Sequence, residues 1–227
     1  MKSKTKIKEI FTSIQGEGPY IGVKQLFIRF CGCNLECKYC DTAKEADGTF
    51  FEFTPAELSE HIKTLNLKSI HSISITGGEP LLWSEFLEEF LPLVENKVYL
   101  ETNSTLNSAL EKIINNVDII AADIKLPSAS GIENSFAIHD EFFKSANKYG
   151  KEIFAKIVFD ENILNDEIDH CIKLAEKHDL ELILQPKMDG DTLKMSDKKI
   201  TEIFEKFVSV YPKTRVIPQV HKFLRVQ

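Results

Sequence analysis

Apolar runs alternate with amphipathic stretches along the chain. Seven runs rich in Ile, Val, Leu and Phe have the length of β-strands, and most stretches between them carry apolar residues at helical spacing over about ten to fifteen residues. Such alternation is typical of repeated βα units, in which helices join parallel strands. The predicted strands span residues 24–30, 69–76, 97–102, 117–125, 152–160, 181–187 and 214–219.

Residues 54–57, with the sequence TPAE, predict the start of one helix. Thr54 can cap the helix, Pro55 suits its first position, and Glu57 is placed to close a capping box. Leu58, Ile62 and Leu65 then carry the apolar face. Further helices are predicted over residues 83–95, 166–178 and 198–211, whereas residues 127–139 are expected to form the longest irregular loop, with no role of its own.

Repeated βα units favour an α/β fold. Because crossover connections are right-handed, such units close toward a barrel or spread into a doubly wound sheet, with functional loops at the carboxyl ends of the strands. A length of 227 residues and 43% hydrophobic content allow one sizeable core. Residues 1–227 are therefore expected to form a single domain.

The charge balance limits the classes of partner. A formal net charge of -7 and a pI near 5.5 disfavour a general nucleic-acid binder, which needs basic surface to neutralise phosphates. The basic amino terminus lacks the apolar run of a secretory signal, and no segment offers the roughly 18 apolar residues of a membrane span. We expect a cytoplasmic protein with neither nucleic-acid nor membrane partners.

Four of the five cysteines lie between residues 31 and 40. An odd, clustered set of thiols in the cytosol is a poor disulfide framework, so metal or cluster ligation is the better interpretation. Cys33, Cys37 and Cys40 follow the first predicted strand with the spacing C-x-x-x-C-x-x-C. Three thiolates can hold three corners of a cubane cluster and leave one iron open for a ligand.

The thiols have two other interpretations, a structural zinc site and a cluster with Cys31 as a fourth ligand. Structural zinc usually takes two close pairs of ligands separated by a longer spacer, and no second pair follows here. Cys31 could supply a fourth thiolate, but at the end of an alternating strand it is more simply a packed side chain. Cys171 falls on the apolar side of a helix with Ile168 and Leu174 and is expected in the core.

Polar motifs also stand at the ends of later predicted strands: ITGGEP at 75–80, LETN at 100–103, DIK at 123–125 and LQPKMDG at 184–190. Taken singly, each motif is typical of a solvated strand end or a turn. Taken together, they are expected to line one site at the carboxyl ends of the parallel strands. Paired glycines would let the backbone approach a ligand closely there.

The cysteine triplet followed by ITGGEP resembles the radical S-adenosylmethionine superfamily. The resemblance implies a partial (βα)6-type barrel, with a loop after the first barrel strand that binds a 4Fe-4S cluster. It also implies S-adenosylmethionine as the cofactor. The residues that would contact this cofactor are Gly77, Gly78, Glu79, Glu101, Asn103, Asp123, Lys125, Gln185, Pro186, Lys187 and Met188.

Within the superfamily, EIFTSIQGEGPYIG at 9–22, RFCGCNLECKYCDT at 29–42 and PQVHKFLRVQ at 218–227 resemble the 7-carboxy-7-deazaguanine synthase family of the queuosine precursor pathway. The resemblance implies a carbon-nitrogen lyase that contracts the ring of 6-carboxy-5,6,7,8-tetrahydropterin and releases ammonia. Arg29 would pair with the substrate carboxylate, and Gln227 would supply the terminal carboxylate of the chain. The implied substrate contacts are Ile14, Gln15, Gly16, Glu17, Arg29, Thr76, His221 and Gln227.

By the same resemblance Thr42 would contact Mg²⁺, although Asp41-Thr42 could instead cap a turn. The expected partners are the pterin, an external electron donor of the flavodoxin or ferredoxin kind, and a second copy of the chain in a homodimer. One alternative is a glycyl-radical activase, which would have no evident use for Arg29, Thr42 and the His-Lys tail together. The other is an iron-sulfur or zinc module without enzymatic activity, which would not explain the motifs at the strand ends.

Overall fold

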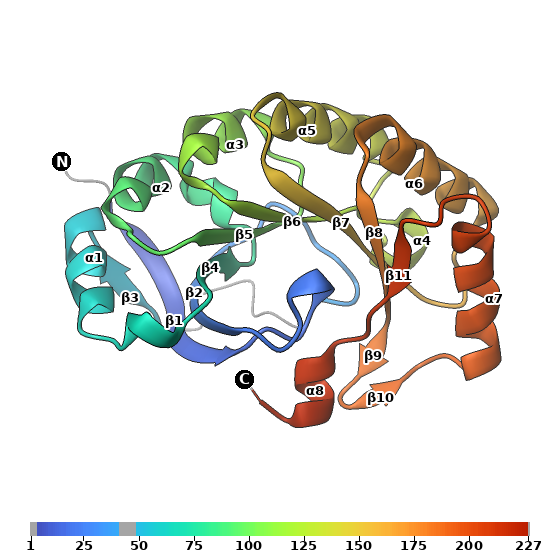
Figure 1. The fold of residues 1–227 in the computed structure, drawn as a ribbon, viewed down its shortest axis with the longest axis horizontal. Coiled ribbons are helices and arrows are strands. Elements are labelled where there is room, and N and C mark those ends of the chain that lie inside the picture. The colour runs from blue at the N-terminus through green and yellow to red at the C-terminus, as the bar shows by residue number, and fades with distance from the viewer. Residues whose placement is uncertain (1–3, 41–48, 227) are drawn as a thin grey trace.

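The structure is a computed structural model that describes residues 4–40 and 49–226. Its main sheet has the strand order β11-β8-β7-β6-β5-β4-β2-β1-β3 (Figure 1). The strands from β11 to β2 are mutually parallel, whereas β1 runs antiparallel to both β2 and β3. The sheet strands are β1 Thr5–Ile14, β2 Lys24–Phe30, β3 Phe51–Phe53, β4 Ser72–Gly77, β5 Val98–Thr102, β6 Ile119–Asp123, β7 Glu152–Phe159, β8 Glu181–Pro186 and β11 Thr214–Val216.

Helices follow the parallel strands in the order that βα repeats require. The helices α1, α2, α3, α5, α6 and α7 lie in an arc along the outer side of the curved sheet, while the short β9–β10 hairpin and α8 lie on the opposite side (Figure 1). Strands β2, β4, β5, β6, β7 and β8 thus open six βα units, which confirms the predicted partial (βα)6 architecture. The helices are α1 Pro55–Lys63, α2 Ser84–Phe90, α3 Asn107–Ile113, α4 Pro127–Ser130, α5 Phe136–Lys148, α6 Asn165–His178, α7 Asp197–Val208 and α8 Val220–Leu224, and the hairpin pairs β9 Met188–Asp189 with β10 Thr192–Leu193.

The start of α1 has the predicted capping box. The Thr54 hydroxyl accepts the backbone N–H of Glu57 at 3.4 Å, and the Glu57 carboxylate accepts the N–H of Thr54 at 2.8 Å. Each residue thus satisfies a donor that the first helical turn leaves without an intrahelical partner.

One sequence interpretation was wrong, and several elements, among them β1, β3, α3 and α8, were not predicted. Residues 127–139 are not an irregular loop, because they contain α4 and the first turn of α5, and His139 is fully buried. The strand β1 was not predicted at all. Its pairing with β2 shifts register between Ile7 and Glu9, and this irregularity breaks the alternation of apolar and polar residues by which a strand is recognised.

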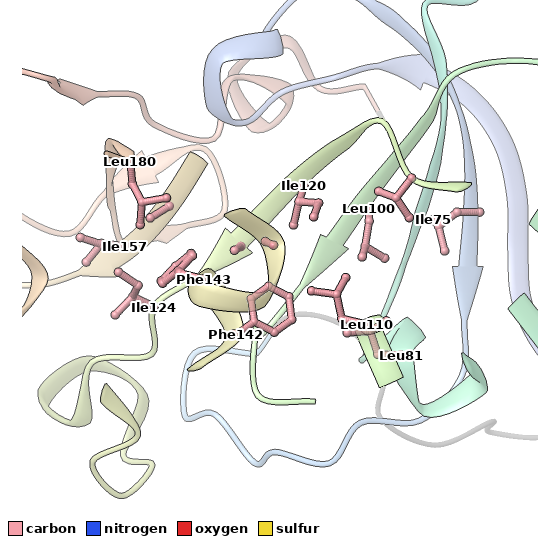
Figure 2. Packing of buried hydrophobic residues seen from close by; sticks show 14 of the residues in the cluster. Ile75, Leu81, Leu100, Leu110, Ile120, Ile124, Phe142, Phe143, Ile157 and Leu180 are labelled. Atoms are coloured by element: carbon pink, nitrogen blue, oxygen red, sulfur yellow. The ribbon is translucent and has the colours of Figure 1, made fainter. Parts of the chain in front are cut away.

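The core lies between the parallel strands and the helices that cover them. Figure 2 shows side chains of β4, β5 and β6 meeting Leu110 of α3 and the adjacent Phe142 and Phe143 of α5. All three of these helix residues are fully buried, and the two phenylalanine rings pack edge to face. Cys171 is fully buried in the same cluster, as predicted. Among the described residues, no helix combines the length and apolar character that crossing a bilayer requires.

Candidate active site

A cleft of about 470 Å³ opens at the carboxyl ends of the parallel strands. It gathers nearly all of the residues that the sequence singled out. Predicted cofactor residues in its lining are Cys33, Cys37, Cys40, Gly77, Gly78, Glu101, Asn103, Asp123, Lys125, Gln185, Pro186, Lys187 and Met188. Predicted substrate residues in its lining are Ile14, Gln15, Gly16, Glu17, Arg29, Thr76 and His221.

The loop after β2 carries the three cysteines, which form what we call the cysteine end of the cleft. Burial raises the pKa of Cys33 and of Cys37, and nearby Lys125 acts in the opposite direction on both. The loop is held to α4 by the backbone N–H of Lys38, which donates to the carbonyl of Ser130 at 2.8 Å. Cys31 is buried behind the cleft, as predicted.

Gly77 and Gly78 lie directly against this loop. A Cβ at Gly77 would lie 2.2 Å from the carbonyl oxygen of Phe30, and one at Gly78 would lie 2.2 Å from that of Gly32. The backbone N–H of Glu79 donates to the same Gly32 oxygen at 2.8 Å. The packing of the turn after β4 against the end of β2 and the cysteine loop therefore requires both glycines, independently of any ligand.

Glu79 does not line the cleft. Its carboxylate is fully buried and accepts backbone N–H groups of Asn103 at 2.7 Å and Leu81 at 3.0 Å, together with the Thr102 hydroxyl at 2.9 Å. Burial raises the pKa of Glu79 to about 7, in spite of these hydrogen bonds. In this structure Glu79 joins the turn after β4 to the end of β5.

A buried histidine supports the same region. The backbone N–H of Lys125 donates to Nε2 of His139, so the ring proton belongs on Nδ1, 2.7 Å from the Ser104 hydroxyl. That hydroxyl donates in turn to the carbonyl of Asp123 at 2.8 Å. Burial lowers the pKa of His139 to about 4, so the ring is neutral at physiological pH.

At the opposite side of the cleft, which we call the Glu17 end, charged side chains form a continuous chain. The ammonium of Lys125 lies 2.6 Å from Oδ2 of Asp123, and that of Lys156 lies 3.2 Å from Oδ1. Lys156 also pairs with Oε2 of Glu17, whose Oε1 accepts the Gln219 amide at 2.8 Å. Burial alone would raise the pKa of Glu17, but Lys156 and Gln219 outweigh it and hold the pKa at about 2.

Gln15 has a fixed orientation beside this chain. Its amide donates to Glu101 and to Gln25, at 2.9 Å in each case, and its oxygen accepts the backbone N–H of Glu17 at 2.9 Å. The hydroxyl of Thr76 donates to the other oxygen of Glu101 at 2.8 Å. These contacts join the loop after β1 to the ends of β4 and β5.

Arg29 and the C-terminal segment close the Glu17 end. The Nε of Arg29 donates to Glu9 at 2.6 Å, which uses one of the five N–H donors of the guanidinium group. Helix α8 packs on Gly16, where a Cβ would lie 2.4 Å from Nδ1 of His221. The carbonyl of Gly16 also accepts the backbone N–H of Val220 at 2.9 Å.

Among the cleft residues that sequence reasoning missed, Lys156 and Gln219 are the two that contact Glu17. A signal for Lys156 was present, because a lysine inside the buried strand sequence EIFAKIVF needs a charged partner. Gln219 lies in the C-terminal motif PQVHKFLRVQ, but nothing in that motif indicates its contact with Glu17, 202 residues away in the sequence. Thr42 and Gln227 lie outside the described residues.

Comparison with known proteins places this cleft in a family. Residues 27–175 match the model described as Radical SAM superfamily. The 7-carboxy-7-deazaguanine synthase of Geobacter sulfurreducens is 38% identical over 98% of both chains. The chain belongs to the 7-carboxy-7-deazaguanine synthase family of the radical SAM superfamily. This assignment favours the synthase over the activase and the non-enzymatic module that the sequence left open.

Solved structures share the fold of this chain. QueE from Escherichia coli superposes with a TM-score of 0.66 at 20% identity, covering 96% of this chain and 95% of that chain. Native anSMEcpe with bound AdoMet and Kp18Cys peptide superposes with a TM-score of 0.60 at 18% identity, covering 82% of this chain and 59% of that chain.

Membership of the superfamily implies a 4Fe-4S cluster and S-adenosylmethionine, and the cysteine end fits both. Among the described residues, no three Cys, His, Asp or Glu side chains converge closely enough to hold one metal ion. A cubane cluster instead takes each thiolate at a separate iron corner, as three cysteines around a cleft can provide. In the part of the chain that the structure describes, no group donates a hydrogen bond to Oε1 of the buried Gln185. Gln185 lines the cleft, where an N–H group of a ligand could reach this oxygen.

Proposed function

We propose that the protein converts 6-carboxy-5,6,7,8-tetrahydropterin to 7-carboxy-7-deazaguanine with release of ammonia. The observation that carries this proposal is that one cleft has three thiols at one end and an ionised, oriented carboxylate at the other. When bound, the cluster and S-adenosylmethionine supply one-electron chemistry that begins by removing a hydrogen atom from the substrate.

The residues of the Glu17 end have matching roles in this proposal. An ionised Glu17 can accept the adjacent N–H groups of the pterin amide and amine. Gln15 is held beside it by Glu101 and Gln25 and can extend the same recognition. The remaining N–H donors of Arg29 suit the substrate carboxylate, because a guanidinium group binds a carboxylate through two parallel hydrogen bonds. His221, on a helix that packs on Gly16, would cover the bound ring.

The cysteine end holds the cofactors in this proposal. Cys33, Cys37 and Cys40 would bind the cluster, and Gly77 and Gly78 would let the turn after β4 lie close to the cofactor. Except for Glu79, which does not line the cleft, the other predicted contacts of the cofactor lie at the ends of β5, β6 and β8.

We also propose that Mg²⁺ assists the reaction through the hydroxyl of Thr42. The support is the position of Thr42 two residues after Cys40 in the family motif, together with the preference of Mg²⁺ for oxygen ligands. Thr42→Ala should weaken the dependence of turnover on added Mg²⁺ while the absorbance of the reconstituted cluster is kept. Equal Mg²⁺ titration curves for the parent and the variant would refute this role.

We further propose a cytoplasmic homodimer that receives electrons from a flavodoxin- or ferredoxin-like donor. The five cysteines are free thiols, as cluster assembly in a reducing compartment requires. Light scattering of the anaerobic protein would test the dimer, and a mass of one chain would contradict it. Electron donation would be tested by replacing dithionite with reduced flavodoxin or ferredoxin in the assay below, where absence of product with both would contradict that partner.

The function is tested by anaerobic incubation of the reconstituted protein with carboxytetrahydropterin, S-adenosylmethionine, Mg²⁺ and dithionite. We expect 7-carboxy-7-deazaguanine by mass spectrometry, and no product when S-adenosylmethionine is left out. Cleavage of S-adenosylmethionine without any deazapurine would show that the substrate is a different molecule.

A further inference from the structure

Lys156 is a charged residue in the middle of a buried parallel strand. Its neighbours in β7, Ala155 and Ile157, are fully buried, and its own side chain is only 11% exposed. The ammonium group of a lysine at this depth needs an oppositely charged partner, because moving an unpaired charge out of water is strongly unfavourable. The ammonium is shared here between the carboxylates of Glu17 and Asp123.

The contacts of Glu17 leave room for a ligand. Each carboxylate oxygen has one protein donor, Lys156 on Oε2 and Gln219 on Oε1. An ionised carboxylate accepts hydrogen bonds at about four lone-pair positions, so both oxygens can accept another N–H. Glu17 lines the cleft, where such a donor can reach it.

We infer that Lys156 is a positioning residue for substrate recognition, which keeps Glu17 ionised and oriented so that both oxygens accept N–H groups of a guanine-like ring. The inference rests on the proposed function, because that function supplies the ring. A protonated Glu17 would turn one acceptor into a donor and lose the match to two adjacent N–H groups. Lys156 would thus control how well the ring binds without touching it.

The surrounding charges explain why Lys156 is needed. Without its ammonium group, the buried carboxylates of Glu17 and Asp123 would lose the positive charge that they share. Burial would then raise the pKa of Glu17, because Lys156 would no longer outweigh it. The other ionisable groups that face Lys156 or Glu17 are Tyr99 and Glu101 on β5, Asp123 and Lys125 at the end of β6, and His221 on α8.

The test measures binding rather than turnover, with 7-carboxy-7-deazaguanine as the probe. This compound is stable in air and carries the guanine-like edge. Its Kd is measured by calorimetry from pH 5.5 to 8.5 for the parent protein and for Lys156→Met, Lys156→Arg and the exposed-site control Lys173→Met. Ratios of the variant Kd to the parent Kd cancel the titration of the probe, which is the same in every measurement.

We expect Lys156→Met to raise Kd by about tenfold or more near pH 6, the size of effect when a charged hydrogen-bond acceptor becomes neutral. The ratio should fall as pH rises, because Glu17 ionises again at higher pH. Lys156→Arg should restore most of the affinity and a flat ratio, and Lys173→Met should match the parent.

A double-mutant cycle protects the test against a general structural effect. If Lys156 acts through Glu17, adding Lys156→Met to Glu17→Gln should change Kd by less than about twofold at every pH, because residue 17 then has no carboxyl group to ionise. A pH-independent ratio for Lys156→Met, or equal losses in the two backgrounds, would overturn the inference. Failure of the parent protein to bind the probe would instead refute the proposed function.

If Lys156→Met does not fold, Lys156→Gln takes its place in the cycle, with circular dichroism to establish folding. If neither folds, the ratio of the Lys156→Arg Kd to the parent Kd decides: a flat ratio near one supports the inference. An Arg ratio above about tenfold at every pH would overturn it, because a retained charge would then fail to preserve binding.

Discussion

The cysteine end and the Glu17 end of the cleft are held in shape by different kinds of contact. At the cysteine end, main-chain groups approach so closely that Gly77 and Gly78 have no room for a side chain. At the Glu17 end, side-chain charges and amides from β6, β7 and the C-terminal segment fix one carboxylate. Gly16 also packs closely on His221 at the Glu17 end, so both ends are sensitive to shape, but only the Glu17 end depends on paired charges that protonation would change.

The largest expected effect is at the cysteine end. Cys37→Ala should abolish cleavage of S-adenosylmethionine, because a cluster that lacks one of three thiolates is not held with a single open iron. Iron content and electron paramagnetic resonance of the reduced protein would measure the loss. Cys31→Ala removes a buried thiol of the same segment and should keep the cluster. A Cys31 variant without iron would mean that the ligand set is wrong.

Gly78→Ala comes next and tests main-chain packing alone. Its Cβ would meet the Gly32 carbonyl at 2.2 Å and Cβ of Cys33 at 2.9 Å, so the cysteine loop must move. We expect iron incorporation to fall severalfold and cofactor cleavage by about a hundredfold, the scale of loss from misplacing a reacting group by about 1 Å. Gly150→Ala is the control for backbone strain without a close contact, since its φ is +61° but its Cβ meets no neighbouring atom within 4 Å. Equal iron content in both variants would contradict the packing role.

Gly16→Ala applies the same change to the Glu17 end. Its Cβ would meet the backbone and side chain of His221 within 2.6 Å and displace α8. We expect the Kd for 7-carboxy-7-deazaguanine to rise about tenfold, or about 1.4 kcal/mol, while iron content stays unchanged. Gly150→Ala is again the control, because it lies far along the chain from this loop and its Cβ meets no neighbouring atom within 4 Å, although its φ of +61° adds backbone strain. Loss of iron in Gly16→Ala would mean that the two ends are not built independently.

The last prediction concerns stability and its dependence on pH, and leaves binding and turnover at both ends of the cleft unchanged near neutral pH. The pKa of His139 is about 4 in the folded protein, below its ordinary value of 6.5. Between pH 6.5 and pH 4, His139 is therefore protonated in the unfolded chain but not in the folded protein. The free energy of unfolding should therefore fall by about 3 kcal/mol through this residue as pH drops from 6.5 to 4.

His139→Gln should remove that dependence, as measured by urea unfolding of the cluster-free protein against the exposed-site control His61→Gln. Glu79, with its pKa of about 7, has the opposite effect: its contribution to the free energy of unfolding falls as pH rises from 4.5 to 7. It is present in both proteins, so it cancels in the difference. Parallel curves for the parent and His139→Gln would contradict the assignment of a neutral, buried ring.

The same contrast explains what the sequence could predict. Continuous apolar strands such as residues 24–30, and local motifs such as the cysteine spacing and GGEP, were recognisable because their residues are neighbours in the chain. The pairing of Lys156 with Glu17 spans 139 residues, and no local pattern encodes it. Residues 127–139 were interpreted as a loop for a different reason. Pro127 and Gly131 are typical of a loop, but here they are the first residue and the C-cap of the short helix α4.

The contact between Gln219 and Glu17 also bears on the order in which the protein folds. It closes a loop of 202 residues, and contacts of such long sequence separation form late because the chain loses more freedom when it brings their ends together. The βα units can assemble from nearer neighbours beforehand. Pulsed hydrogen exchange during refolding should accordingly protect the amides of β4 and β5 before that of Val220, which donates to Gly16. The pocket that selects the ring would then be the last part of the molecule to acquire its shape.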